Sequence, residues 1–161
     1  MNKFKNLGLN EPFVKVLEEL NFKEPTEIQE KCIPISLTGK DLIGISATGS
    51  GKTLAFGSAI IEKTIPGRGL QALILAPTRE LAEQISKTLK KFSKYYNLKI
   101  EEIYGGVSFS PQQSKLKKAD IVVATPGRIL DHISQRTINL SKLRFLVLDE
   151  ADRMLDMGFI D

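Results

Sequence analysis

A glycine-rich run, Gly49-Ser50-Gly51, is followed directly by Lys52 and Thr53. Glycines and other small residues let successive backbone N–H groups converge on an anion, because no bulky side chain stands in the way. We expect the ammonium of Lys52 to reach the β- and γ-phosphates of a nucleotide and the hydroxyl of Thr53 to ligate Mg²⁺. The general phosphate-loop pattern has a glycine five residues before Gly51, and this chain has Ser46 there. The order of apolar run, loop, Lys-Thr and helix still predicts a phosphate site, with a chance glycine turn as the alternative.

A second candidate group is acidic and lies about a hundred residues further along. Asp149 and Glu150 directly follow the apolar run Phe145–Leu148. A carboxylate at Asp149 can hold Mg²⁺ or its waters, while Glu150 orients and deprotonates an attacking water. Alternatively, Asp149-Glu150-Ala151-Asp152 is only an acidic start that stabilises a following helix. Together with the phosphate loop, the acidic group indicates nucleotide hydrolysis.

These groups need a scaffold, and the apolar pattern predicts one. Short apolar runs alternate with longer periodic stretches that suit helices. The runs expected to form strands are Leu42–Ile45, Ala72–Ala76, Lys99–Tyr104, Ile121–Ala124 and Phe145–Leu148. Runs of Leu, Ile and Val without polar alternation indicate strands buried on both faces, and their alternation with helices indicates a mostly parallel sheet in an α/β fold. The polar groups that follow the strands would then meet at one edge of the sheet.

Three helix starts are marked by capping residues. Thr26 with Gln29 has the spacing of a capping box, and so has Ser110 with Gln113. Thr125 is a cap followed by a proline in the first turn.

The composition predicts one ordinary globular domain. The chain has 161 residues, of which 42% are hydrophobic and 26% charged. The absence of a long apolar stretch predicts a cytoplasmic chain with no membrane anchor. The single cysteine, Cys32, excludes an internal disulfide and is expected to be a small buried thiol, and the single His132 makes zinc chemistry improbable.

The net charge of +4 permits a nucleic-acid partner without establishing one. The densest basic segment follows apolar residues at helical spacing, so it is first of all the solvent face of an amphipathic helix. Its lysines are Lys87, Lys90, Lys91 and Lys94.

Six sequence blocks in order resemble those of the DEAD-box family of ATP-dependent RNA helicases. They are Phe22-Lys23-Glu24-Pro25-Thr26-Glu27-Ile28-Gln29, Ser46-Ala47-Thr48-Gly49-Ser50-Gly51-Lys52-Thr53, Pro77-Thr78-Arg79-Glu80-Leu81-Ala82, Gly105-Gly106, Thr125-Pro126-Gly127-Arg128 and Asp149-Glu150-Ala151-Asp152. The resemblance runs from Phe4 to the last residue and implies the first of two RecA-like domains, a three-layer P-loop NTPase sandwich. Asn21 stands where the family usually has glycine, and Glu27 where it often has proline.

The resemblance implies an ATP site with Mg²⁺ as the metal. Gln29 would read the adenine edge through its amide, and Phe4 would stack on the base; the alternative is that Gln29 only completes a capping box and Phe4 is a core residue. The implied ATP-binding residues are Phe4, Phe22, Thr26, Gln29, Ala47, Thr48, Gly49, Ser50, Gly51, Lys52 and Thr53. The implied catalytic residues are Lys52, Asp149 and Glu150, and the metal would be held by Thr53 and Asp149, partly through water.

The resemblance also implies an RNA partner gripped through its sugar-phosphate backbone, without reading of base sequence. The residues implied are Pro77, Thr78, Arg79, Gly105, Gly106, Thr125, Pro126, Gly127 and Arg128. Thr78 and Thr125 are equally well explained as helix caps, and Arg79 and Arg128 as surface residues. The two interpretations are compatible, because helix N-termini that need caps also bind anions.

By the resemblance, residues 1–38 are an adenine-recognition segment and residues 39–161 the RecA-like core. The family's later Ser-Ala-Thr motif, whose strand lies between the phosphate-loop strand and the Asp-Glu strand, does not follow the acidic group, and neither does a second RecA-like domain. We therefore expect a sheet that lacks its last strands, with a gap at its centre, and a piece that is inactive alone as a helicase. Two other functions stay open: a non-catalytic RNA- or protein-binding module, and a DNA-directed helicase of a sister family. The sequence does not indicate an oligomeric state.

Overall fold

The structure is a computed structural model, and it describes residues 2–159. The chain forms two compact units, described separately below. The first contains the residues up to Lys63 together with Thr88–Asn97, and the second contains Thr64–Lys87 and the residues from Leu98 onwards. Helix α4, Arg79–Phe92, contributes its first part to the second unit and its last turn to the first. The boundary expected after residue 38 separates an adenine-recognition segment from the RecA-like core by their expected roles. It is not a boundary between compact units, and it stays a prediction.

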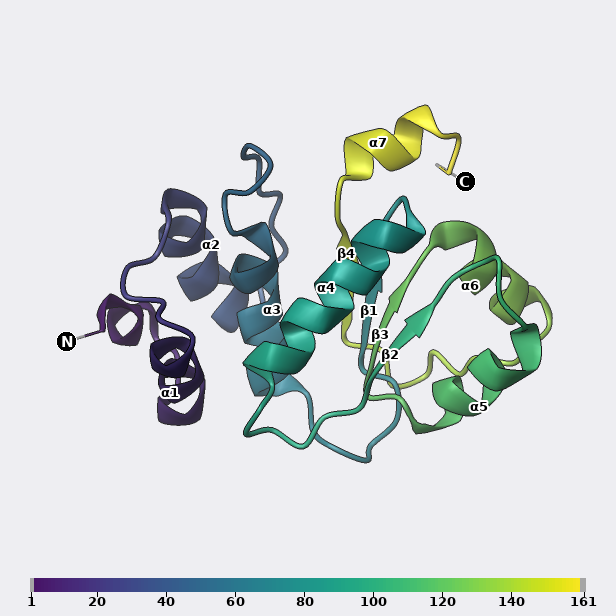
Figure 1. Cartoon of the computed structure of the whole chain (residues 1–161), viewed down its shortest axis with the longest axis horizontal. Helices are drawn as coiled ribbons and strands as arrows, with labels where there is room; N and C mark the ends of the chain where they lie inside the picture. The colour runs from purple at the N-terminus through teal and green to yellow at the C-terminus, as the bar shows by residue number, and fades with distance from the viewer. Residues whose placement is uncertain (1, 160–161) are drawn as a thin grey trace. The chain divides into compact units, whose positions relative to one another are not determined.

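The first unit is helical (Figure 1), and its first three helices begin directly after capping residues. Its elements are η1 (Lys3–Leu7), α1 (Glu11–Glu19), α2 (Glu27–Leu37) and α3 (Lys52–Lys63). The side chain of Asn2 accepts a hydrogen bond from the N–H of Phe4 (3.0 Å), and that of Asn10 accepts one from the N–H of Phe13 (3.2 Å). The capping box of Thr26 and Gln29 is confirmed, and α2 begins directly after Thr26.

Large apolar side chains fill the core of the first unit. The ring centroid of Phe13 lies 6.0 Å from that of Phe92 and 6.2 Å from that of Tyr96. Cys32 is a buried free thiol, as expected. The largest fully buried side chains of this unit are Phe4, Phe13, Leu17, Ile33, Leu54, Ile60, Ile61 and Leu89.

The strand expected at Leu42–Ile45 is not present, so this prediction is wrong for the structure. The segment has no regular secondary structure, and the side chains of Ile43 and Ile45 are 92% and 90% exposed. A strand requires a neighbour that accepts and donates its backbone hydrogen bonds, and among residues 2–159 this segment has none.

The second unit contains one parallel sheet of four strands, in the order β2-β3-β1-β4. The strands are β1 (Ala72–Leu75), β2 (Ile100–Ile103), β3 (Ile121–Ala124) and β4 (Phe145–Leu148). They confirm the expected α/β fold with a parallel sheet. Leu75 is in register with both Ala124 and Leu148, and Ile103 is in register with Ala124. All four strands therefore end level with one another, which brings the segments after them to one edge.

Helices α5 (Phe109–Lys118) and α6 (Pro126–Ser134) cover one face of this sheet (Figure 1). The core on that face consists of Leu70, Leu73, Ile103, Leu116, Ala119, Val122, Ala124 and Ile129. Thr125 precedes α6 with Pro126 in its first turn, as expected. The prediction that a helix begins after a cap at Ser110 is wrong. Ser108 is the N-cap of α5, and Ser110 lies inside the helix.

The basic segment confirms the amphipathic helix expected there. Ile85, Leu89 and Phe92 are buried, whereas the four lysines are exposed. None of the helices in the described part of the chain combines the length and the apolar character needed to cross a lipid bilayer.

Candidate nucleotide and nucleic-acid site

The glycine-rich loop lies in the first unit and ends where α3 begins, at Lys52. Gly49 and Gly51 have φ values of 79° and 88°, a left-handed conformation that glycine adopts without strain. Within the loop, the ammonium of Lys52 donates to the carbonyl of Ser46 (3.0 Å), and the hydroxyls of Ser46 and Ser50 lie 2.6 Å apart. The lysine side chain thus folds back over its own loop, in the place where phosphates are expected.

The predicted adenine segment contacts this loop through two side chains. The hydroxyl of Thr26 donates to the carbonyl of Ser50 (2.7 Å), and the amide nitrogen of Gln29 donates to the carbonyl of Gly51 (3.1 Å). The amide oxygen of Gln29 accepts from the N–H of Thr26 (3.0 Å), and its side chain is almost fully buried. A Cβ atom on Gly51 would lie 2.2 Å from the amide nitrogen of Gln29, so only glycine fits there without movement. The structure therefore brings the capping role of Gln29 and a contact with the phosphate loop together in one amide.

Of the two predicted aromatic residues, Phe4 is buried and Phe22 is half-buried in the first unit. Phe4 has no exposed surface, and the ring of Phe22 packs edge-on against Phe92 with centroids 5.8 Å apart. A buried ring offers no free face to a base, so stacking by Phe4 stays a prediction that requires the ring to be uncovered. Asn21, before Phe22, has a φ of 63°, a conformation that asparagine tolerates, which explains how it can replace the usual glycine.

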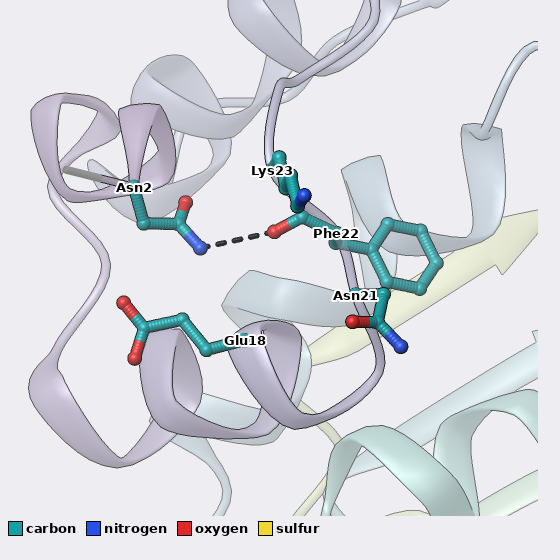
Figure 2. Close-up of a pocket in the computed structure, with 5 residues that line it drawn as sticks. All are labelled: Asn2, Glu18, Asn21, Phe22 and Lys23. Carbon is teal, nitrogen blue, oxygen red and sulfur yellow. Dashed lines mark hydrogen bonds between the residues drawn. The ribbon is translucent and has the colours of Figure 1, made fainter.

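A pocket of about 350 Å³ lies beside this segment (Figure 2). The amide nitrogen of Asn2 donates across it to the carbonyl of Phe22 (3.0 Å), and the ring of Phe22 points away from Asn2. The pocket is lined by Asn2, Glu18, Asn21, Phe22 and Lys23, so Phe22 is the only predicted site residue among them.

The acidic group lies in the second unit, at the end of β4. The N–H of Asp149 continues the β1–β4 pairing by donating to the carbonyl of Leu75 (2.9 Å). Glu150 has a φ of 52° and precedes α7 (Ala151–Asp156). A left-handed glutamate is strained, and such strain is concentrated at functional sites. Asp149 accepts a hydrogen bond from the N–H of Glu150 (3.1 Å), and the carboxylate of Glu150 lies 3.4 Å from the guanidinium of Arg153.

The predicted RNA-contacting residues all lie in the second unit, after β1, β2 and β3. The hydroxyl of Thr78 accepts from the N–H of Leu81 (3.2 Å), so Thr78 is a helix cap whose own proton can still be donated. Thr125 occupies the cap position of α6 but makes no side-chain cap hydrogen bond. Gly105 and Gly106 are exposed after β2, and Gly106 has a φ of 82°. Pro77 and Pro126 are buried, whereas Gly127 is exposed.

Arg79 is held by two neighbours. Its guanidinium lies 4.5 Å from the ring centroid of Tyr104 and donates to the carboxylate of Glu83 (3.1 Å). This hydrogen bond from Arg79 to Glu83 raises the pKa of Arg79 and lowers the pKa of Glu83. Both side chains are about half exposed, so this ion pair is weak enough to be exchanged for a phosphate.

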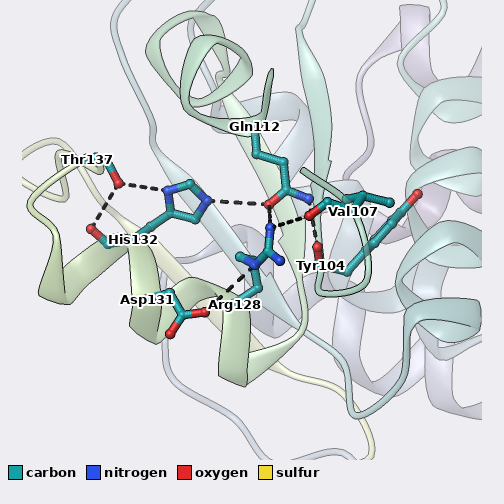
Figure 3. A network of polar contacts seen from close by, with 7 residues as sticks. All are labelled: Tyr104, Val107, Gln112, Arg128, Asp131, His132 and Thr137. Carbon is teal, nitrogen blue, oxygen red and sulfur yellow. Dashed lines mark hydrogen bonds and ion pairs between the residues drawn. The ribbon is translucent and has the colours of Figure 1, made fainter. Parts of the chain in front are cut away.

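Arg128 belongs to a buried polar network that sequence reasoning missed (Figure 3). Its guanidinium donates to the carbonyl of Val107 (3.0 Å) and to the amide oxygen of Gln112 (3.1 Å). The amide nitrogen of Gln112 donates to the carbonyl of Tyr104 (2.7 Å). Gln112 lies four residues before the buried Leu116 on α5, so a polar residue on the apolar stripe was the signal that could have revealed it.

His132 completes the network. Its Nδ1 lies 2.7 Å from the hydroxyl of Thr137 and its Nε2 3.4 Å from the amide oxygen of Gln112. The hydroxyl of Thr137 donates to the backbone carbonyl of His132 (3.2 Å), and the donor and acceptor roles of the two ring nitrogens depend on the tautomer. The ring stacks on Phe109 with centroids 4.1 Å apart. Burial lowers the pKa of His132, so the neutral ring is favoured.

In the described part of the chain, no three His, Cys, Asp or Glu side chains are grouped so that they alone could hold a metal ion. Thr53 lies in the first unit and Asp149 in the second, so a Mg²⁺ site that uses both stays a prediction.

The fold and the motifs have counterparts among known proteins. The family model of the DEAD/DEAH box helicases matches residues 26–161, so the chain belongs to this family, as predicted. The ATP-dependent RNA helicase CshA of Listeria monocytogenes is 53% identical to this chain over an alignment of 163 positions. The alignment covers 100% of this chain and 31% of that protein. This chain thus spans about a third of the length of that relative.

Two solved structures are similar to this chain over nearly its whole length. A DEAD box protein from the hyperthermophile Methanococcus jannaschii has a TM-score of 0.95 at 45% identity, covering 98% of this chain and 44% of the other. A hypothetical ATP-dependent RNA helicase from Sulfolobus tokodaii has a TM-score of 0.87 at 42% identity, covering 95% and 45%. These neighbours confirm the expected RecA-like fold of the DEAD-box proteins.

Proposed function

We propose that this chain is the ATP-binding and RNA-contacting first domain of an ATP-dependent RNA helicase. In the longer protein, ATP hydrolysis would be coupled to local separation of RNA strands or to remodelling of RNA–protein complexes. The observation that carries the proposal is the level ending of the four parallel strands, which gathers three predicted RNA-contacting segments and the acidic pair at one edge of the sheet. The relative from Listeria, which is named an ATP-dependent RNA helicase, supports the same assignment.

The nucleotide part of the proposal assigns ATP and Mg²⁺ to the predicted residues. Lys52 would leave the carbonyl of Ser46 and bind the phosphates, which offer a negative charge in place of a neutral oxygen. Thr53 and Asp149 would hold the magnesium ion, and Glu150 would orient and deprotonate the attacking water. Gln29 has a second N–H and a second lone pair for the adenine edge while it keeps its contacts with Thr26 and Gly51.

The RNA part assigns backbone contacts to groups in the segments after β1, β2 and β3. Arg79 and Arg128 offer positive charge, Thr78 offers a hydroxyl proton, and the glycines offer unobstructed backbone N–H groups. Such contacts bind RNA without reading its sequence. A second RecA-like domain in the longer protein would complete the RNA surface, and a cytoplasmic location accompanies this function.

Turnover by the full-length protein that carries this chain tests the nucleotide assignment. Lys52→Ala or Glu150→Gln should lower RNA-stimulated ATP hydrolysis by at least about a hundredfold, because each removes a group that acts on the reacting phosphate or water. Lys63→Ala and Asp156→Asn are matched controls at the far ends of α3 and α7 and should retain turnover. Undiminished hydrolysis in both test variants would refute the assignment.

Competition between RNA and DNA oligonucleotides of matched sequence, at one fixed salt concentration, tests the substrate class. RNA should compete more strongly; equal or stronger competition by DNA would favour a DNA-directed helicase.

A non-catalytic role remains the second candidate for the 161-residue chain by itself. The contact of Lys52 with its own loop and the exposed run Leu42–Ile45 favour it. Strand separation by the purified chain would contradict this second proposal.

A further inference from the structure

We propose that the side-chain amide of Gln112 is a positioning group for the nucleic-acid face: it keeps Arg128 and the turn Gly105–Val107 in one fixed arrangement. The proposal deepens the proposed function and rests on it, because it explains how this face is kept ready for a sugar-phosphate backbone.

The amide of Gln112 is buried and fully oriented. The side chain is 4% exposed, and a buried amide is costly unless its hydrogen bonds are made. Its nitrogen donates to the carbonyl of Tyr104 (2.7 Å), and its oxygen accepts from Arg128 (3.1 Å). The reverse orientation would put oxygen against oxygen and N–H against guanidinium, so only one rotamer of the amide satisfies both neighbours.

The partner on one side is a cation whose charge is not cancelled. One nitrogen of Arg128 donates to two neutral oxygens, those of Gln112 and Val107. Asp131 is the nearby carboxylate, at 3.8 Å from Nε; its side chain is 61% exposed, so it screens the charge only weakly, whereas the side chain of Arg128 is 14% exposed and reaches solvent over a small part of its surface. Gln112 therefore orients the guanidinium while leaving its positive charge for a phosphate.

The partner on the other side is the backbone that leads into the glycine turn. The carbonyl bound by Gln112 belongs to Tyr104, directly before Gly105. The ring of the same tyrosine lies under the guanidinium of Arg79, at 4.5 Å from its centroid. Gln112 thus connects the arginine that follows β3 to the residue that supports the arginine after β1 (Figure 3).

The imidazole ring of His132 is a further neighbour of the Gln112 amide oxygen. Its Nε2 lies 3.4 Å from the amide oxygen of Gln112, and its ring is stacked on Phe109. A long arginine side chain that is already oriented loses less freedom when it binds a phosphate, so the network should increase RNA affinity rather than the rate of chemistry.

The test uses the full-length protein that carries this chain and a fluorescently labelled single-stranded oligouridylate at one fixed salt concentration. Gln112→Met keeps the length of the side chain and removes its hydrogen bonds. We expect the Kd for the RNA, and the RNA concentration for half-maximal ATPase, to rise by roughly tenfold, the size of a lost hydrogen bond to a charged group. The maximal ATPase rate and the half-saturating ATP concentration should stay within about twofold.

Leu116→Ala is the matched control, because it opens a cavity one turn further along the same helix without touching the network. It should lower the unfolding temperature at least as much as Gln112→Met and leave the Kd for RNA unchanged. If the Kd of Leu116→Ala rises in step with its loss of stability, the effect belongs to folding and the proposal is overturned.

A double-mutant cycle with Arg128→Ala tests whether Gln112 affects RNA binding through Arg128. If Gln112 acts through Arg128, the double variant should bind RNA no more weakly than Arg128→Ala alone. Fully additive losses, or normal binding by Gln112→Met while Arg128→Ala binds weakly, would overturn the positioning role and leave the proposed function intact. Normal binding by Arg128→Ala would overturn the proposed RNA face and the positioning role together.

Discussion

Two apolar runs of four residues, Ile121–Ala124 and Leu42–Ile45, differ in whether they form a strand and in how far their side chains are buried. The first is β3, which hydrogen-bonds to β1 on one side and to β2 on the other, and its four residues have no exposed surface. The second forms no strand, and Ile43 and Ile45 are almost completely exposed. Apolar character therefore did not by itself produce a buried strand. Strand β3 has a neighbouring strand on each edge, whereas Leu42–Ile45 has none within residues 2–159.

Strand β4 is the intermediate case. It pairs with β1 on one side only, and its residues alternate between half-buried and exposed, with Leu146 at 60% and Leu148 at 53%. Among the described residues, β4 is therefore an edge strand with exposed leucines. Backbone pairing and side-chain burial decrease together from β3 through β4 to Leu42–Ile45.

The largest effect should come from the same substitution made in the two runs. Ile121→Ala should lower the free energy of unfolding by about 2–5 kcal/mol, because it removes a buried side chain and leaves a cavity. Ile43→Ala should change it by no more than about 0.5 kcal/mol, because the side chain is already in water. Urea unfolding of both variants measures the difference; equal losses would show that Leu42–Ile45 is buried in solution and would remove the contrast.

The loop after the unpaired run depends on side-chain contacts instead of strand pairing, and its two glycines allow a matched test. Gly51→Ala should be destabilising by about 1–3 kcal/mol, because it combines a left-handed backbone with a collision against Gln29. Gly49 has a similar φ, but nothing lies within 4 Å of an added Cβ. Gly49→Ala should therefore lower the free energy of unfolding only by the backbone strain, about 1 kcal/mol. Thermal unfolding compares them, and equal losses would mean that Gln29 does not hold the loop.

The exposed edge of β4 should influence association more than stability. Leu146→Lys should change the free energy of unfolding by no more than about 0.5 kcal/mol, because the side chain is mostly solvated. A lysine on an edge strand opposes pairing with another chain, so sedimentation experiments should show less association for Leu146→Lys than for the unaltered chain at the highest concentrations. A large loss of stability would show that Leu146 is covered in solution.

The smallest effect concerns the buried network that follows β3. Burial lowers the pKa of His132, so the unfolded chain takes up this proton at a higher pH than the folded chain does. The stability present above the ordinary value of 6.5 is therefore lost as the pH falls below it. His132→Gln should show a smaller loss of stability on acidification, measured by urea unfolding across this pH range. An unchanged pH dependence would mean that another group is responsible.

The features that sequence reasoning predicted correctly are those with local causes. Four of the five expected strands formed, and α2 and α6 begin directly after Thr26 and Thr125, as expected. The cap of α5 is Ser108 and not the expected Ser110, because which of two nearby serines caps a helix depends on where the preceding turn ends. The roles of the predicted ATP and RNA residues stay predictions, although the positions of the RNA residues and of the acidic pair follow directly from the strand ends.

The missed features depend on residues distant in sequence. Gln112 looked like an ordinary polar helix residue, and only the fold shows that it joins Tyr104 to Arg128. The direct contacts of Thr26 and Gln29 with the phosphate loop likewise join segments more than twenty residues apart.

The sequence by itself determined the family, the α/β class, the four strands that formed and the order of the motifs, because each rests on residue types at short spacing. The tertiary structure decided which apolar runs became paired strands, where Lys52 points, and which side chains orient Arg79 and Arg128. The physical reason is that backbone pairing and burial require partners, and partners are supplied by the whole fold.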